Sequence, residues 1–303
     1  MSSLSTPANG GPEPILLLLD PAARRADGES VRIAKDVLCG GTDVKLACPE
    51  GPSELDRMLS HRGRRRPVVI GSDLALRRVL QALHRQCELG VDPVGMIPVG
   101  RAEESAAARA LGVPGEPVRA ARAVLSGVPR RLDLLVDDGG GVALGGVRIT
   151  CGGARRMVGR PGGWRSLWAK LAAAEQGTTL TAEAVESGSR VRVEADGRLL
   201  ADVHRPVRLV QVTLPGAEPE AAAVNGTADG TADGAVNGTA DGLLEVVVRA
   251  PGGLVRARAA SVSVVGRGFD YEADGHPVGP VRARTWTAHP GAWGLLLPAR
   301  PVG

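Results

Sequence analysis

Aromatic side chains are almost absent from this sequence of 303 residues. Phe, Trp and Tyr together make up 2% of it, with a single Phe and a single Tyr. The hydrophobic fraction of 43% is ordinary for a globular protein, so a core must be built from Val, Leu, Ala and Ile. Lysine is also scarce, and Lys35, Lys45 and Lys170 are the only lysines of the chain.

Cysteines arranged for a metal site or a disulfide framework are missing too. Cys39, Cys48, Cys87 and Cys151 are scattered, with no C-x-x-C pair and no His at the spacing of metal ligands. This pattern argues against a zinc site and against a disulfide-stapled fold, and it suits a reducing compartment. We therefore assign no metal-ligating residue.

The sequence has no long hydrophobic run. The run from Ile15 to Leu19 is too short to cross a bilayer and is typical of a buried strand. The start, MSSLSTPANGGPEP, lacks the basic and apolar regions of a secretory signal, so we expect a cytoplasmic protein. A net charge of +4 permits contact with phosphates or with an anionic membrane at its inner face, and it does not indicate a nucleic-acid partner.

Strands and helices alternate over residues 14–135. Apolar residues at i, i+3, i+4, i+7 and i+11 predict a helix over 76–87, and shorter helices are expected over 30–38 and 103–111. Helices of this length between strands indicate a parallel sheet with crossover helices, which is a Rossmann-like α/β domain. The expected strands read PILLLLD, DVKLACP, PVVIGSD and VGMIPVG.

The pattern changes over residues 136–303, where strand-like segments follow one another with Asp-Gly turns and little helix between them. This favours an all-β, sandwich-like second domain. Residues 1–13 are rich in Ser, Gly, Pro and Asn and are expected to be disordered. Residues 215–240 are of low complexity, and their unevenly spaced copies of VNGTADG indicate a tolerant surface loop.

The ordered set of motifs resembles the diacylglycerol kinase family. Asp20-Pro21 ends the first strand, where the family has Asn-Pro. VVIGSDLALRRVLQAL lies where the family has a strand, Gly-Gly-Asp-Gly-Thr and an amphipathic helix, and VGMIPVG is similar to the strand that leads into its Pro-Leu-Gly-Thr. ARALGVP and ADGLLEVVV also match family segments, so the resemblance covers most of residues 14–303.

This resemblance implies a nucleotide-binding domain over 14–135, a β-sandwich domain over 136–303 and ATP in the cleft between them. The activity implied is transfer of phosphate from ATP, with Mg²⁺, to the hydroxyl of a lipid such as diacylglycerol. Asp241 matches the position of the family's catalytic base. The resemblance assigns the nucleotide side to Asp20, Gly71, Ser72, Asp73, Gly100 and Arg101.

The phosphate-binding turn departs from the family pattern. The chain has Gly71-Ser72-Asp73-Leu74-Ala75 where the family has Gly-Gly-Asp-Gly-Thr, so two glycines and the Thr hydroxyl are missing. Glycines allow backbone N–H groups to approach phosphate oxygens closely, and a branched side chain at Leu74 stands in that place. The departure puts nucleotide binding in doubt.

Several candidate residues have a second interpretation. Arg101, which replaces a family Thr, either points its charge at phosphate or pairs with Glu104. Asp73 either caps the helix that follows it or organises a metal ion. Asp241 is either the catalytic base or, with Gly242, only the turn into a strand.

Other charged groups are expected to be structural. The arginine-rich segment 62–66 is interpreted as a solvated loop, with attraction of anionic lipid head groups as the alternative. Asp196-Gly197 and Asp274-Gly275 are interpreted as plain hairpin turns. The five histidines form no visible pair, so a histidine base is not expected.

Two functions from different classes follow. One is an active lipid kinase whose rate of phosphate transfer is low. The other is a catalytically degenerate relative that binds nucleotide or lipid. NAD kinase, which shares the glycine-rich loop, ranks below both because its Asn-Glu pair is not found after residue 100. A Rossmann dehydrogenase is excluded, since no G-x-G-x-x-G follows the first strand. Neither the oligomeric state nor the lipid follows from the sequence.

Overall fold

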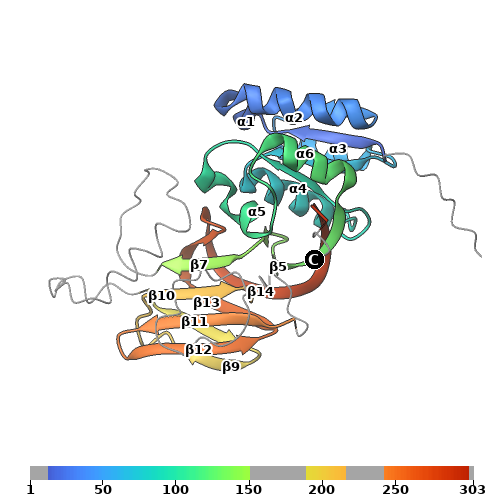
Figure 1. Ribbon diagram of the computed structural model, residues 1–303. Coiled ribbons are helices and arrows are strands. Elements are labelled where there is room, and N and C mark those ends of the chain that lie inside the picture. Colours follow the sequence, from blue (N-terminus) through green and yellow to red (C-terminus); the bar gives the residue numbers. More distant parts are fainter. Residues whose placement is uncertain (1–12, 151–188, 216–241, 300–303) are drawn as a thin grey trace, which may run out of the picture.

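The computed structural model describes residues 13–150, 189–215 and 242–299. It contains a four-stranded parallel sheet with helices and a ten-stranded antiparallel sheet, which lie one after the other in the chain (Figure 1). The α/β domain followed by an all-β part, which the sequence predicts, is confirmed. The expected disordered segment, apart from Glu13, and most of the expected low-complexity loop lie outside the described residues.

The parallel sheet has the strand order β2-β1-β3-β4. Its strands are β1 (Ile15–Leu19), β2 (Val44–Ala47), β3 (Arg66–Gly71) and β4 (Gly95–Pro98). β1 is buried along its whole length because helices cover both faces of the sheet. β2 is an edge strand and is largely exposed.

Helices cover the two faces of this sheet with separate sets of apolar side chains. α2 (Gly28–Gly41) and α6 (Pro117–Ser126) pack on the face formed by alternate residues such as Leu17 and Ile70. α3 (Pro52–Ser60) and α4 (Asp73–Arg85) pack on the opposite face. The remaining helical segments are α1 (Pro21–Ala26), η1 (Ala102–Ser105) and α5 (Ala106–Ala110).

The predicted helix over 76–87 is present as α4, with Leu76, Leu80 and Leu83 buried. Its end was placed wrongly. α4 ends at Arg85, and Cys87 is exposed with φ +57°, so it lies in the left-handed region that terminates a helix.

The antiparallel sheet runs in the order β12-β11-β10-β7-β13-β14-β5-β6, and β8 and β9 are attached through β13. Figure 1 shows it as a curled layer below the α/β part. Its strands are β5 (Val128–Asp137), β6 (Val142–Ala143), β7 (Gly146–Thr150), β8 (Val191–Ala195), β9 (Arg198–Ala201), β10 (Leu209–Thr213), β11 (Leu244–Ala250), β12 (Gly253–Ala259), β13 (Ser261–Ala273) and β14 (His276–Leu297).

The end of β14 joins the two parts. The backbone N–H of Val94 donates to the carbonyl of Gly294 at 2.7 Å, and the N–H of Leu296 donates to the carbonyl of Val94 at 3.0 Å. Trp293 and Leu295 belong to the core cluster that contains α4, whereas Leu296 packs into the cluster on the other face of the parallel sheet. The α/β part therefore includes a strand from the far end of the chain.

Candidate functional site

The carboxyl ends of β1, β3 and β4 meet at one edge, and this places two of the predicted site residues, Asp20 and Gly71, side by side. The N–H of Asp20 donates to Ile70 and the N–H of Val99 donates to Gly71, each at 3.0 Å. A Cβ built on Gly71 would lie 2.8 Å from the Cβ of Asp20, so only glycine fits there. Asp20 itself caps α1, since its Oδ1 accepts from the N–H of Ala22 at 2.9 Å.

The link from β3 to α4 is a single residue, Ser72. Its backbone is extended and its side chain makes no capping hydrogen bond. Residues 71–75 contain no positive φ, because α4 begins at Asp73 and takes in Leu74 as an ordinary helical residue. The chain therefore does not adopt a glycine-dependent phosphate turn at this position, and Ser72, Leu74 and Ala75 fit its backbone without strain.

Asp73 caps a helix, but not the helix that the sequence indicated. Ser72 holds the N-cap position of α4, and the carboxylate of Asp73 reaches across to α5. Its two oxygens accept from the N–H of Ala107 at 2.7 Å and of Ala108 at 2.9 Å. The side chain is buried, and this burial, opposed by the two hydrogen bonds, raises the pKa of Asp73 to about 7.

Asp274, from the turn between β13 and β14, is the second carboxylate of this junction. Its oxygens accept from the N–H groups of Leu144, Gly145 and Gly146 at 2.8, 2.9 and 3.2 Å. Burial of the carboxylate raises its pKa, and its negative charge adds to the raised pKa of Asp73. The two carboxylates thus interact across the boundary between the α/β part and the antiparallel sheet.

Arg77 and His276 complete the junction. Arg77 is on α4, one turn after Asp73, and its Nη1 donates to the carbonyl of Ala273 at 2.6 Å. Burial lowers the pKa of Arg77, and burial together with the charge of Arg77 lowers the pKa of His276. His276 Nδ1 lies 3.0 Å from the carbonyl of Asp274, which can only accept, so Nδ1 carries the proton and Nε2 is left as an acceptor.

A second network supports the antiparallel side of the junction. Tyr271, the single tyrosine of the chain, donates to Asp137 Oδ2 at 2.8 Å and stacks edge-on against Trp286. Burial is the main cause of the raised pKa of Tyr271, and the hydrogen bond to Asp137 raises it further. Arg284 lies 3.6 Å from Asp137, so the buried carboxylate is paired. This network holds the β13–β14 hairpin in place.

The second predicted loop is occupied by one of its own carboxylates. Gly100 has φ +122°, and a Cβ built on it would lie 2.8 Å from Glu104 Oε2. The same oxygen accepts from the backbone N–H of Arg101 at 3.2 Å. The Arg101 side chain is exposed and forms no ion pair with Glu104 among the described contacts. The predicted pairing of Arg101 with Glu104 is therefore present only as a hydrogen bond from the backbone N–H of Arg101.

Asp241 lies outside the described residues, and the structure therefore does not test the predicted base. In the described part of the antiparallel sheet, the carboxylate that meets Asp73 is Asp274, which the sequence marked only as a hairpin turn. No local signal in the sequence distinguishes Asp274 from Asp196, because the distinction depends on tertiary contacts.

Most of the arginine cluster is engaged within the protein. Arg62 is buried and pairs with Glu88 and Asp92. Arg65 pairs with Asp43 at 2.8 Å, and Arg66 pairs with Glu13. The interpretation as a purely solvated loop is wrong for Arg62, which ties the loop before β3 to the loop before β4.

Two histidines that are far apart in the sequence do lie side by side. The rings of His84 and His289 are 6.0 Å apart and nearly perpendicular. Burial and the neighbouring His84 lower the pKa of His289. The pair lies where the end of α4 meets β14, away from the start of α4 that carries Asp73.

No protein-family model and no curated protein matches this chain. Solved structures do resemble it. One, titled a putative diacylglycerol kinase from Bacillus anthracis str. Sterne, has 16% identity and a TM-score of 0.68, and the match covers 96% of this chain and 99% of that one. A second with the same description has 15% identity, a TM-score of 0.66 and coverage of 94% and 97%. A third, titled a diacylglycerol kinase from the same organism, has 14% identity, a TM-score of 0.57 and the same coverage. At this identity the likeness shows that the chain has the two-domain fold of these proteins.

Proposed function

We propose that this protein is a lipid kinase of the diacylglycerol kinase type, which transfers phosphate from ATP to a lipid hydroxyl at a low rate. The observation that carries the proposal is the fold, which the chain shares over 96% of its length with a solved structure titled a putative diacylglycerol kinase. Ligands of open α/β sheets bind outside the carboxyl ends of the strands, which is where Asp20 and Gly71 meet and where the Gly100 loop begins. Both substrates are therefore expected at this edge.

The nucleotide phosphates would lie at the start of α4. This helix has 13 residues, and the Ser72 side chain leaves its first N–H groups uncapped. Uncapped N–H groups at a helix start favour anions. Arg101, whose side chain is exposed, would supply a positive charge from the neighbouring loop.

The described residues do not form a magnesium site by themselves. They contain no group of three His, Cys, Asp or Glu side chains that could hold a metal ion. Asp73 is a poor ligand, because both its oxygens accept backbone N–H bonds and its pKa is raised to about 7. Mg²⁺ remains an expectation for the bound nucleotide, whose phosphates would provide most of the ligands.

The base that takes the proton of the lipid hydroxyl is proposed to be Asp241, by its resemblance to the family position. A second candidate is His276, favoured by the hydrogen bond that fixes its proton on Nδ1 and leaves Nε2 as an acceptor. The lowered pKa of His276 keeps the ring neutral at pH 7, as a base requires.

A specific contact favours the alternative, a degenerate relative with poor nucleotide binding. The Glu104 carboxylate occupies the space beside Gly100, and a phosphate entering this loop would meet that negative charge. Ser72, Leu74 and Ala75 also bring side chains where the family has glycines and Thr. These features are the reason that we expect a low rate.

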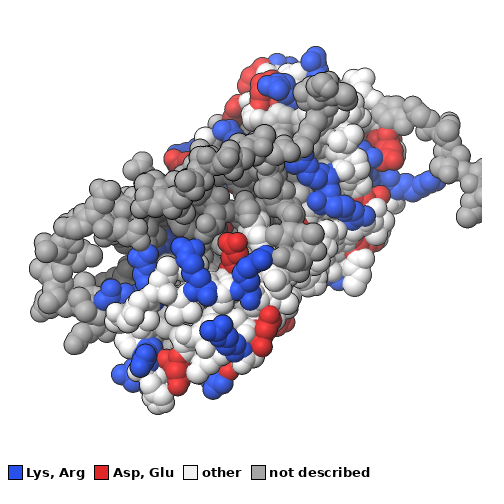
Figure 2. All heavy atoms as spheres, turned by 60° about the horizontal axis from the view of Figure 1, so that its bottom comes forward, with Lys and Arg blue, Asp and Glu red and all other residues white. Residues whose placement is uncertain are grey.

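The lipid acceptor would be reached at a membrane surface. Among the described residues, no helix combines the length and apolar character needed to span a bilayer. Figure 2 shows basic side chains on both parts of the visible face, with acidic ones among them. The net charge of +4 agrees with peripheral contact with an anionic surface, where each basic group contributes about 1 kcal/mol.

The decisive experiment is transfer of radiolabelled phosphate from ATP to diacylglycerol in mixed micelles. We expect weak transfer by the wild type. Replacement of the base lowers such a rate by a factor of about 10² to 10⁴, so Asp241→Asn should abolish most of it and His276→Gln should reduce it less. If His276→Gln abolishes transfer and Asp241→Asn leaves it intact, the base is His276. Absence of any transfer by the wild type would favour the degenerate relative.

Calorimetry with MgATP directly tests whether the Glu104 carboxylate hinders nucleotide binding at the Gly100 loop. We expect Glu104→Gln to raise the affinity by about tenfold, which corresponds to removal of about 1.4 kcal/mol of repulsion. Glu103→Gln is the matched control, because Glu103 is the exposed neighbour on the same 3₁₀ turn and makes no contact with Gly100. Equal affinity of the two variants would show that Glu104 does not obstruct the site.

A further inference from the structure

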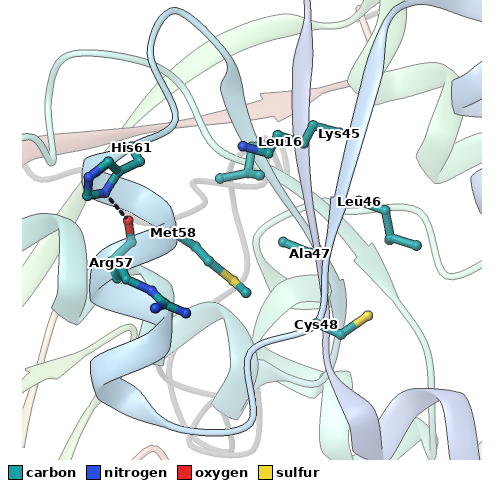
Figure 3. A pocket seen from close by; sticks show the side chains of 8 residues that line it. All are labelled: Leu16, Lys45, Leu46, Ala47, Cys48, Arg57, Met58 and His61. Atoms are coloured by element: carbon teal, nitrogen blue, oxygen red, sulfur yellow. Dashed lines mark hydrogen bonds between the residues drawn. The ribbon is translucent and has the colours of Figure 1, made fainter.

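A hollow of about 430 Å³ lies between α3 and the edge strand β2 (Figure 3). Pockets that bind small molecules range from about 300 to 1,000 Å³. α3 is held by α4, through the Arg85–Asp56 ion pair at 2.7 Å and a bond from Gln86 to the Asp56 carbonyl at 2.9 Å. These contacts fix α3 on α4, and the hollow lies where α3 faces the edge strand.

The floor and walls of the hollow are apolar. Leu16 and Ala47 are buried in the sheet, and Leu46 is 49% exposed at its edge. Met58 extends from α3 toward the strand, as Figure 3 shows. Its unbranched side chain adapts to different apolar shapes. A ligand with an alkyl or aryl body would bury this surface.

The charged groups that line the hollow are all basic. Lys45 reaches from β2 toward α3, and Arg57 extends from α3 toward β2 (Figure 3). Lys45 forms no ion pair with any described residue, and Arg57 has a single acidic partner, Glu54, at 3.7 Å. His61 Nδ1 lies 2.8 Å from the carbonyl of Arg57, so it carries the proton and Nε2 is free for a ligand.

From this geometry we infer that the hollow binds a single-chain anionic amphiphile, with its carboxylate or phosphate head at Lys45 or Arg57 and its chain against Met58 and the edge of β2. Lys45 and Arg57 enter the hollow from opposite walls, and no acidic residue lines it. The hollow is at β2, and β1 separates this strand from β3, which leads to Asp73. The inference therefore does not rest on the proposed kinase activity.

Cys48 gives a direct readout of binding, because it lines the hollow and is a free, exposed cysteine. Cys39 and Cys87 are also free and exposed but do not line it, so they are internal controls in the same molecule. The rate of alkylation of each cysteine by iodoacetamide is measured by mass spectrometry of its peptide. The probes, kept below their micelle concentrations, are decanoate, decyl phosphate, decanol and inorganic phosphate.

We expect decanoate and decyl phosphate to slow alkylation of Cys48 in a saturable way, by fivefold or more, while Cys39 and Cys87 are unaffected. A stronger effect of one of the two probes identifies the preferred head group. Decanol and inorganic phosphate should protect weakly, because each offers only half of the interaction. Equal protection of all three cysteines, equal protection by decanol, or no protection at Cys48 would overturn the inference.

Variants that remove one charge test whether protection of Cys48 comes from binding at this site. Lys45→Met and Arg57→Met are exposed substitutions that leave the core intact, and at least one of them should raise the half-protecting concentration of decanoate by about three- to tenfold, as expected for loss of one partly exposed ion pair. Arg64→Met is the control, since Arg64 is exposed and does not line the hollow. The same shift in Arg64→Met would show that net charge, and not this site, sets the protection.

Discussion

The two Asp-Gly hairpin turns of the antiparallel sheet share one sequence and one conformation. Asp196-Gly197 has φ values of +47° and +79°, and Asp274-Gly275 has +49° and +77°. In both turns the Asp carboxylate accepts backbone N–H groups from a neighbouring segment. For Asp196 the donors are Ala260 at 2.9 Å and Ser261 at 2.8 Å.

The surroundings of the two carboxylates differ. Asp196 is exposed, whereas Asp274 accepts three N–H groups at the boundary with the α/β part, in the field of Arg77 and Asp73. Burial raises the pKa of Asp274 above its ordinary value. The comparison shows that the local sequence determines the turn, while the neighbours brought by the fold determine whether its carboxylate has a chemical role.

The largest expected effect is a dependence of the free energy of unfolding on pH. It arises from Asp73, the buried carboxylate that lies near Asp274 and has no counterpart at Asp196. The pKa of Asp73 is raised from 3.8 to about 7, so the folded state holds a proton that the unfolded state releases between these values. The free energy of unfolding should therefore fall as pH rises from about 4 to 7, by at most about 4 kcal/mol at 1.36 kcal/mol per unit.

Urea denaturation of the wild type and of Asp73→Asn across this range checks the effect. The variant cannot titrate at this position, so its curve should lack this part of the decline. Asp196→Asn, in the exposed turn, should keep the wild-type dependence. A wild-type slope that survives in Asp73→Asn would assign the proton to another group.

Alanine replacement of the two turn residues compares them directly. Asp274→Ala leaves three N–H groups without their acceptor, and we expect a loss of about 3 kcal/mol in the free energy of unfolding. Asp196→Ala exposes its two donors to water and should cost roughly 1 kcal/mol or less. The penalty for alanine at positive φ is common to both variants and cancels. Equal losses in denaturant unfolding would mean that the junction adds nothing to the turn.

The smallest expected effect is that of Arg77. Arg77→Met removes the donor to the carbonyl of Ala273 and should cost about 1 kcal/mol. The variant should also raise the pKa of His276, because the charge of Arg77 lowers it. NMR titration of the His276 ring measures this shift, and Arg77→Lys, which keeps the charge, should preserve most of the wild-type value.

Much of the fold could be predicted from the residues. The apolar spacing of Leu76, Leu80 and Leu83 located α4, and the alternation of strands and helices indicated the parallel sheet. Helices α1, α3 and α6 were not predicted. Each begins with Pro at its first turn and is only six to ten residues long, so its apolar pattern is too short to stand out.

Less of the candidate site could be predicted. Asp20, Gly71 and Asp73 do lie at one edge, because strand ends of a parallel sheet converge there. The role of Asp73 as a cap for α5, 34 residues further along the chain, depends on how the two helices pack. The place of Asp274 depends in the same way on a hairpin whose contact with α4, from Arg77 to Ala273, spans 196 residues of sequence, and no local pattern predicts such a contact.

The pairing of Val94 with Gly294 and Leu296 has a consequence for synthesis of the protein. During translation the α/β half leaves the ribosome first, yet the strand segment that pairs with Val94 appears only after most of the antiparallel sheet. Contacts between residues so far apart in the chain form slowly. Until residue 297 has emerged, the apolar surface that Trp293, Leu295 and Leu297 cover stays open to water. The first half is thus dependent on a segment that is made later, and during that interval its exposed apolar surface favours aggregation.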